Sequence, residues 1–349
     1  MRLLIITQKV DSEDPVLGFF HRWIAEFSKN VDSLIVICLY KGHSNLPANV
    51  KVFSLGKENG SGRLSYLLNF KKILWQQRNE YDAVFVHMNQ IYMVLAGIWW
   101  KLTGKKTALW YTHRQVSLSL KMAVMLADKI FTASKESFRI PSPKVMPMGH
   151  GIDTDAFSPS SAKNEAKKAS QKFNIITVGR ISPVKGYDTM LDAMNILKQK
   201  GIDFHFTVIG GPATPADEEY YKKLLERVSS SALSGNVAFV GPVSNTATIP
   251  YLQSSDIFIN MSGTGGLDKA VLEAMAVGLP VVTCNETFES TLGQYGLMVK
   301  PGDAEGLVKV LETMYNDSVK ASQTGLALRD IVVNTHNLEN LIKRIVKAY

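Results

Sequence analysis

The stretch Asp256 to Cys284, DIFINMSGTGGLDKAVLEAMAVGLPVVTC, predicts a strand, a glycine loop, a helix and a second strand. Its first residues, DIFINMS, have the β-branched and aromatic side chains of a buried strand, and PVVTC has the same character. Between these strands, Gly263, Gly265 and Gly266 allow the backbone to turn sharply and to approach a ligand closely. The alternation of strand and helix predicts an α/β fold.

The helix of this stretch is expected to begin near Asp268 and to end at Gly278, because Pro280 cannot continue it. A glycine loop that enters a helix N-terminus favours anion binding, since unpaired N–H groups and the helix dipole face the same point. Glu273 interrupts the apolar run AVLEAMAV, and a buried carboxylate requires a partner. A surface charge or an internal salt bridge is the alternative interpretation of Glu273.

Composition indicates a globular protein of two domains. The chain has 349 residues, of which 46% are hydrophobic and 20% are charged. Cys38 and Cys284 lie far apart in apolar segments, so we expect free thiols in a cytosolic protein. The net charge of +8 indicates an anionic partner, such as an anionic membrane surface or a phosphorylated substrate. Nucleic acid is not expected as a partner, since no nucleic-acid-binding motif accompanies the charge.

Strands and helices alternate in both halves of the sequence, which predicts parallel sheets covered by helices. The polar segment 158–172, rich in Ser, Lys and Ala, interrupts this alternation and is typical of an interdomain linker. We therefore expect a first Rossmann-like domain over residues 1–160 and a second over residues 173–333. Residues 334–349 are expected to form a C-terminal helix with an apolar stripe.

Two cations follow the first strand of the second half, in the segment TVGRISPVKGYDT. Arg180 comes directly after the predicted strand, and Lys185 lies on the following loop. At the carboxyl edge of a parallel sheet, a guanidinium and an ammonium group can bind a diphosphate. Two solvated loop cations are the alternative interpretation from spacing alone.

The segment VGRISPVKG, the pattern S-x-x-x-G-L-D-K-x-V-L-E-A-M-A-x-G-L-P-V-V and the segment HGIDTDAFSP (150–159) together resemble family 4 of the retaining nucleotide-sugar glycosyltransferases. This family has the GT-B fold, which implies two Rossmann-like domains with parallel sheets facing a cleft and a C-terminal helix packed back on the first domain. It also implies metal-independent, retaining transfer of a hexose or related sugar from a nucleotide diphosphate-sugar to an acceptor hydroxyl. Cell-surface glycan or glycolipid assembly is the implied setting.

The resemblance implies roles for particular residues. Arg180 and Lys185 would hold the donor diphosphate, and Glu273 would bind the ribose hydroxyls. His113 resembles the histidine of the first domain that contacts the donor sugar, with a structural histidine as the alternative. The remaining donor-binding positions implied by the family's two loops are Gly18, Gly265, Gly266, Leu267 and Asp268.

Two positions depart from the family pattern. Gly265 stands where the first Glu of the E-x7-E motif belongs, which leaves Asp268 as the nearest carboxylate for the sugar. Gly18 is a single glycine where the family has a pair. Gly265 makes a non-catalytic sugar-nucleotide or glycan-binding relative an alternative. A hydrolysing UDP-sugar epimerase is the other alternative, although the extra catalytic carboxylates that it should carry are not found in the sequence.

No metal or cofactor is expected, and the donor acts as co-substrate. Asp153 and Asp155 have the spacing of a metal-nucleotide motif, but in this segment Asp153 is expected to serve a turn. Aromatic and basic residues alternate in the first half, a mixture typical of a membrane interface, with a solvated helix face over core tryptophans as the alternative. We expect a cytoplasmic protein, peripheral on the inner face of the membrane, with a glycan or lipid-linked acceptor. The residues of this mixture are Lys71, Lys72, Trp75, Arg78, Trp99, Trp100 and Lys101.

Overall fold

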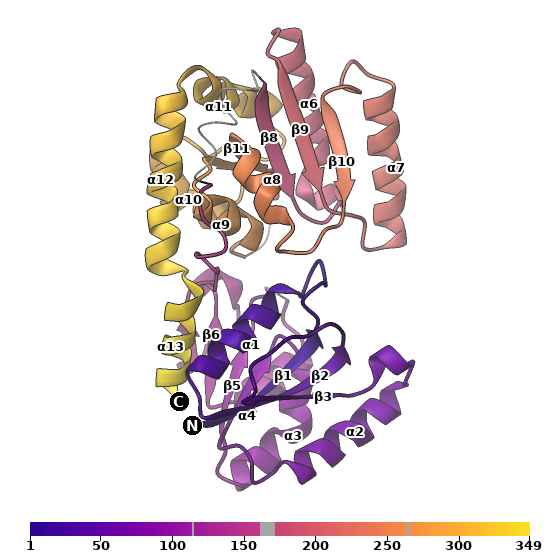
Figure 1. Cartoon of the computed structure of the whole chain (residues 1–349), viewed down its shortest axis with the longest axis vertical. Coiled ribbons are helices and arrows are strands. Elements are labelled where there is room, and N and C mark those ends of the chain that lie inside the picture. Colours follow the sequence, from indigo (N-terminus) through magenta and orange to yellow (C-terminus); the bar gives the residue numbers. More distant parts are fainter. Residues whose placement is uncertain (114, 161–171, 264–265) are drawn as a thin grey trace. The chain divides into compact units, whose positions relative to one another are not determined.

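The computed structural model describes residues 1–113, 115–160, 172–263 and 266–349, and the chain divides into two compact units (Figure 1). The first unit comprises Met1–Gly151 together with Leu338–Tyr349, and the second comprises Ile152–Asn337. Both units are α/β, as the alternation of elements in the sequence predicts.

The first unit is built on a parallel sheet whose strands lie in the order β3-β2-β1-β4-β5-β6-β7. Apolar residues run nearly without interruption through β1, as expected for a strand buried on both faces. The strands are β1 (Arg2–Val10), β2 (Ser33–Lys41), β3 (Val50–Ser54), β4 (Ala83–His87), β5 (Lys106–Trp110), β6 (Lys129–Thr132) and β7 (Val145–Pro147).

Helices cover both faces of this sheet. Alternate residues of a strand point to opposite faces, so Leu4 and Ile6 of β1 pack with α2 (Arg63–Gln76), α3 (Ile91–Leu102) and α4 (Leu118–Leu126). Leu3 and Ile5 pack on the other side with α1 (Phe19–Lys29) and α13 (Leu338–Ala348). The C-terminal helix therefore completes the core of the first unit, as the resemblance implied.

The second unit has a parallel sheet in the order β10-β9-β8-β11-β12, surrounded by helices in one apolar core. Within it, α6 packs against α11 and α9 packs against α12. The strands are β8 (Phe173–Val178), β9 (Phe204–Ile209), β10 (Val237–Gly241), β11 (Ile257–Asn260) and β12 (Val281–Thr283). The helices are α6 (Tyr187–Gln199), α7 (Pro215–Ser229), α8 (Thr248–Ser254), α9 (Lys269–Ala276), α10 (Glu289–Leu292), α11 (Ala304–Asn316) and α12 (Ser318–Thr335).

The division between the units differs from the expected boundaries at residues 160 and 333. Ile152 and Phe157 are buried in the core of the second unit, and the Ile152 N–H donates to the His336 carbonyl at 2.8 Å. The Arg329 guanidinium donates to the Phe157 carbonyl at 3.0 Å. The segment after Gly151 thus belongs to the second unit, because its apolar side chains and its carbonyls find their partners there.

Two further expectations are resolved by burial. Trp100, part of the expected interfacial mixture, is a core residue whose indole N–H donates to the Tyr81 hydroxyl at 3.1 Å. Cys38 and Cys284 are free, buried thiols, as predicted, and burial raises the pKa of Cys38 to about 12. No helix among the described residues is long and apolar enough to cross a bilayer.

Candidate functional site

The loop after β8 places Lys185 at the carboxyl edge of the second sheet. Lys185 closes the short 3-10 turn η3 (Pro183–Lys185), and Gly186 then begins α6 with a left-handed φ of 69°. A Cβ on Gly186 would stand 2.6 Å from the Met261 carbonyl oxygen, so only glycine lets this loop approach the residues that follow β11. The Lys-Gly pair of the motif therefore brings the ammonium group close to the β11–α9 loop.

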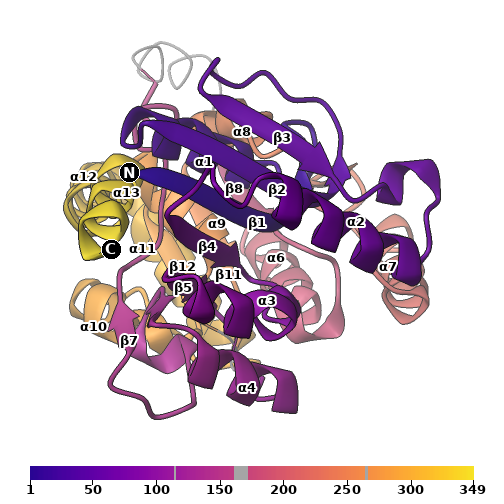
Figure 2. The same ribbon diagram turned by 90° about the horizontal axis from the view of Figure 1, so that it is seen from below.

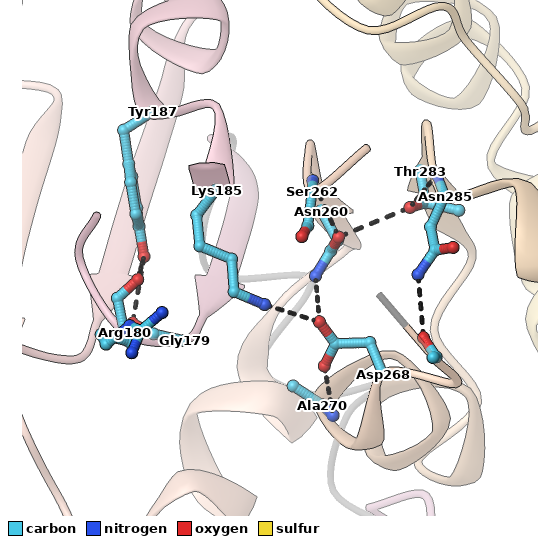
Figure 3. A network of polar contacts seen from close by, with 11 residues as sticks. Gly179, Arg180, Lys185, Tyr187, Asn260, Ser262, Asp268, Ala270, Thr283 and Asn285 are labelled. Atoms are coloured by element: carbon cyan, nitrogen blue, oxygen red, sulfur yellow. Dashed lines mark hydrogen bonds and ion pairs between the residues drawn. The ribbon is translucent and has the colours of Figure 1, made fainter. Parts of the chain in front are cut away.

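Lys185 and Asp268 form an ion pair at the N-terminus of α9. The Lys185 Nζ lies 2.8 Å from the Asp268 Oδ2, and both side chains are largely shielded from solvent (Figure 3). Asp268 is also the N-cap of α9, because its Oδ1 accepts from the Ala270 N–H at 3.2 Å. The expected start of the helix near Asp268 is thus confirmed, and one carboxylate joins the two loops of the site.

Two asparagines fix the neighbouring backbone. Asn260, at the end of β11, donates from Nδ2 to Asp268 Oδ2 at 3.1 Å, and its Oδ1 accepts from the Ser262 N–H at 3.1 Å (Figure 3). Asn285, which follows β12, donates to the Gly266 carbonyl at 3.2 Å. Both asparagines are buried. The glycine loop is therefore tied to two adjacent strands through side-chain amides.

Glu273 lies inside the second unit with two polar partners. Its Oε1 accepts from the Asn245 Nδ2 at 2.8 Å and forms an ion pair with Lys269, one helical turn earlier on α9. The Glu273 side chain is buried, whereas Lys269 is partly exposed. The salt-bridge interpretation of Glu273 is therefore realised, and the same carboxylate lies about one turn from the Asp268 cap.

Arg180 is exposed at the end of β8. The Tyr187 hydroxyl donates to the carbonyls of Gly179 and Arg180, at 3.0 and 3.5 Å, and so fixes the backbone that carries the guanidinium (Figure 3). Nearby, the buried Ser182 hydroxyl has no hydrogen-bond partner among the described residues. The Lys185 Cε lies 4.0 Å from the position that a Cβ on Gly179 would take, so both cations stand beside the same turn.

Four of the predicted site residues lie together at the N-terminus of α9: Lys185, Gly266, Leu267 and Asp268. Glu273 lies within α9 itself. Leu267 packs against the core of the second unit. Gly265 lies outside the described residues. Among the described residues, no group of three or more His, Cys, Asp or Glu side chains is arranged to hold a metal ion. In the 150–159 segment, Asp153 accepts from the Ala156 N–H at 3.0 Å, which is the expected turn.

His113 and Gly18 belong to the first unit. His113 is exposed just beyond β5, with its ring 5.7 Å from that of Tyr111 in an edge-on arrangement. Gly18 precedes α1, and its N–H donates to the Asp14 carbonyl at 3.0 Å. A Cβ at Gly18 would stand 2.5 Å from that same oxygen, so this tight loop requires glycine.

The first unit also contains a histidine that the sequence did not single out. His87 ends β4, is fully buried and stacks on Phe20 with ring centroids 3.7 Å apart. The Thr7 hydroxyl lies 3.2 Å from its Nδ1. Burial, together with the nearby His150, lowers the pKa of His87 to about 3. The next residue, Met88, has a φ of 61°, a conformation that is uncommon for residues other than glycine.

Sequence reasoning missed Asn260, Asn285, Asn245 and Lys269. Asn260 and Asn285 are polar residues at or just after the ends of adjacent apolar strands, a signal that was available in the sequence. Lys269 precedes Glu273 by four residues, which is the spacing of a helical ion pair. Asn245 is brought to Glu273 by tertiary packing, so no local signal marks it.

Comparison with known proteins matches most of the second unit to one family. Residues 172–317 match the model of the family Glycosyl transferases group 1. The lipopolysaccharide core biosynthesis mannosyltransferase LpsB of Rhizobium meliloti is 32% identical over 192 residues, which cover 51% of this chain and 53% of LpsB. The amylovoran biosynthesis glycosyltransferase AmsK of Erwinia amylovora is 30% identical over 48% of this chain and 42% of AmsK. The chain spans about half the length of the curated relatives it matches.

Solved structures show the same fold over the whole chain. HepE of Anabaena, crystallised with UDP and glucose, has a TM-score of 0.79 at 18% identity. The match covers 100% of this chain and 99% of HepE. Sucrose-phosphate synthase of Thermosynechococcus elongatus has a TM-score of 0.75 at 16% identity, covering 100% of this chain and 98% of the synthase. The fold is therefore the two-domain GT-B fold that the resemblance implied.

Proposed function

We propose that this chain transfers a sugar from a nucleoside diphosphate-sugar to an acceptor hydroxyl. Its residues 172–317 match the model of the family Glycosyl transferases group 1. The observation that carries the proposal is the Lys185–Asp268 ion pair at the N-terminus of α9, with Arg180 beside it and the buried Glu273 one turn farther along the helix. Cations and a helix N-terminus suit a diphosphate, and a buried carboxylate suits ribose hydroxyls.

The reaction would be a substitution at the anomeric carbon with retention of configuration. The acceptor oxygen forms a bond to that carbon while the bond to the diphosphate oxygen breaks, and the acceptor proton passes to the departing phosphate. Arg180 and Lys185 would stabilise the negative charge that develops on the diphosphate. Lys185 forms an ion pair with Asp268, so donor binding would exchange this contact for phosphate oxygens.

The remaining residues that the resemblance marks have roles in donor binding. Gly265, Gly266 and Leu267 would present backbone N–H groups to the diphosphate, and Asp268 would contact the sugar. In the first unit, His113 would contact the donor sugar, and Gly18 would be a donor-binding position. No metal or cofactor is required by these roles.

The acceptor would be a growing glycan or a lipid-linked sugar, with the protein peripheral on the inner face of the membrane. LpsB and AmsK act in the biosynthesis of lipopolysaccharide core and amylovoran, as their names state. A related setting, assembly of a cell-surface glycan, agrees with the excess of basic residues in this chain.

The proposal is tested by a thermal-shift screen of UDP-, GDP- and ADP-sugars, followed by donor turnover with and without acceptor. One nucleotide, supplied far above its dissociation constant, should raise the melting temperature by mass action. Transfer that depends on an acceptor supports the proposal. Turnover to an epimerised or free sugar without an acceptor would assign a hydrolysing epimerase, and binding without any turnover would assign a non-catalytic binding protein.

A further inference from the structure

Three helices of the first unit carry apolar stripes that face solvent. On α3, Ile91, Leu95, Ile98 and Leu102 recur at intervals of three and four residues, which places them on one side of the helix. The same spacing recurs in Leu118, Met122 and Met125 of α4. In α2, Leu64, Leu68 and Trp75 are four and seven residues apart, which also places them on one side of the helix. These ten side chains are between 39% and 81% exposed. Buried residues of the same helices already form the core, so the stripes contribute nothing to it.

The three helices form one continuous face, and we call it the α2–α4 face. All three pack on the same side of the sheet, and Figures 1 and 2 show them side by side. Phe70 of α2 lies against Tyr92 of α3, with ring centroids 4.8 Å apart. Gly97 brings α3 so close to α4 that a Cβ there would stand 2.9 Å from the Leu126 Cβ. An apolar surface of this extent marks an interaction site.

Basic residues are interleaved with the stripes. Arg63, Lys71, Lys72, Lys101 and Lys121 are all exposed on these helices, and the sequences of α2, α3 and α4 contain no Asp or Glu. Just beyond α2, Arg78 lies over the ring of the exposed Trp75, 4.4 Å from its centroid. Long basic side chains beside apolar ones allow contact with acyl chains and with phosphate headgroups together.

The two units differ in net charge, and the first unit is the basic one. The first unit has 23 lysines and arginines against 11 aspartates and glutamates, a formal charge of +12. The second unit has 16 against 20, a charge of −4, and the two values add to the net +8. The excess of basic residues thus belongs to the unit that carries the α2–α4 face.

We infer that the α2–α4 face docks the protein on an anionic lipid leaflet. A second copy of this chain is a poor occupant, because a two-fold contact would oppose five basic residues to the same five. An anionic bilayer matches both the apolar stripes and the charge. The inference rests on the proposed function in one respect, which is that the acceptor is linked to a membrane. The α2–α4 face itself is defined without the donor site.

Vesicle cosedimentation of the full chain tests this inference, with no nucleotide present. We expect binding to vesicles of phosphatidylcholine with phosphatidylglycerol, weak binding to phosphatidylcholine alone, and release by added salt through screening. Failure to bind phosphatidylglycerol vesicles at low salt would overturn the inference.

Two variants locate the contact. The stripe variant replaces Leu95, Ile98 and Leu102 by Ser, and the charge variant replaces Lys71, Lys72, Lys101 and Lys121 by Gln. The charge variant should reduce partitioning at least about tenfold, since one surface lysine contributes roughly fivefold. The stripe variant should also reduce partitioning, because the replaced apolar side chains no longer enter the bilayer. The matched controls lie in the second unit and should bind as the wild type does. They are Leu225, Val319 and Leu326 replaced by Ser, and Lys222, Lys223, Lys309 and Lys320 replaced by Gln.

The remaining outcomes separate the alternatives. Binding reduced equally in variants and controls would overturn the inference, because the contact would then be a property of total charge. A wild-type dimer that the stripe variant converts to monomer, without vesicle binding, would assign the face to a second copy. Nucleotide thermal shifts of the same proteins distinguish a failed docking surface from a failed donor site, since the α2–α4 face contains none of the proposed donor residues.

Discussion

Glu273 in the second unit and His87 in the first are both buried, but their surroundings differ. Glu273 is joined to Lys269 in an ion pair and to the Asn245 amide. His87 is surrounded by aromatic rings and a threonine hydroxyl, and burial lowers its pKa to about 3. The second unit keeps a charge inside by pairing it, and the first keeps a ring inside as the neutral form.

The basic residues of the two units differ in a similar way. Around α9, the cations Lys185 and Lys269 each have a carboxylate partner. On α2, α3 and α4, the cations have no acidic residue on their own helices. Paired cations are preorganised for one ligand in one geometry, whereas exposed cations over an apolar surface suit a diffuse anionic partner.

Breaking the pair inside the second unit should have the largest effect. Glu273→Leu leaves Lys269 and Asn245 without their carboxylate, and the free energy of unfolding should fall by about 3–5 kcal/mol. Adding Lys269→Met should restore much of that stability without restoring nucleotide binding. Denaturant unfolding and calorimetric titration with a nucleoside diphosphate measure the two effects.

The control for this pair is Glu312→Leu, which breaks the more exposed Lys200–Glu312 pair. That change should cost about 1 kcal/mol or less. The isosteric Glu273→Gln should weaken nucleoside diphosphate binding while the fold survives. If Glu273→Gln binds nucleotide as the wild type does but unfolds much more easily, Glu273 is a structural ion-pair residue, and the contrast with His87 concerns stability alone.

Removing a proposed diphosphate cation should have the next largest effect. Arg180→Ala or Lys185→Ala should each lower kcat/KM by an amount corresponding to about 2–4 kcal/mol of transition-state stabilisation, the size of one lost oxyanion-type donor. Steady-state kinetics with the donor found by the screen measure this loss. Lys200→Ala, at a surface pair of the same unit, is the matched control. Near-wild-type kinetics in both site variants would exclude the diphosphate role.

Asp268 offers a way to sharpen the comparison, because it has two partners of different kinds. Asp268→Asn should keep the helix cap, since asparagine caps as well as aspartate, but should lose the charge that faces Lys185. Asp268→Ala should lose both, with about 1 kcal/mol of stability from the cap. Both variants should lower kcat/KM by about 1.5–3 kcal/mol. A lower melting temperature for the alanine variant, with wild-type kinetics in both, would make Asp268 a cap alone.

The smallest effect at neutral pH is expected in the first unit, where it appears only as a dependence of stability on pH in acid. The pKa of His87 is about 3 in the folded protein, against about 6.5 for an unfolded histidine. Between these values the unfolded state binds a proton that the folded state does not, so stability falls as pH is lowered through this window. The slope from one group is at most about 1.4 kcal/mol per pH unit. His87→Asn should flatten the pH dependence, and an unchanged slope would contradict this account.

Much of the second unit was predictable because its signals are local. Glycines mark the loop before α9, Asp268 marks its start, and Gly278 and Pro280 mark its end. Arg180 and Lys185 follow a strand of clear apolar character. The partners of these residues were not predictable. Lys185 and Asp268 are separated by 83 positions, and the pairing of β8 with β11 and the packing of Gly186 against Met261 bring their loops together.

The first unit was harder to predict for the opposite reason. Trp99 and Trp100 are adjacent in the sequence, but a helix turns neighbouring side chains to different sides, so that Trp100 enters the core. The boundary at Gly151 was also missed, because the polar composition of residues 158–172 indicates a linker but not the core to which the preceding residues belong.

The helix α13 sets an order for the biosynthesis of the protein. Its residues Leu341, Ile342 and Ile345 are fully buried beside α1, in the unit that is otherwise made of Met1–Gly151. A ribosome translates the entire second unit before it reaches these residues. Until residues 338–349 emerge, the apolar side chains of α1 that α13 covers therefore stay exposed in the nascent first unit. The second unit can complete its folding before then.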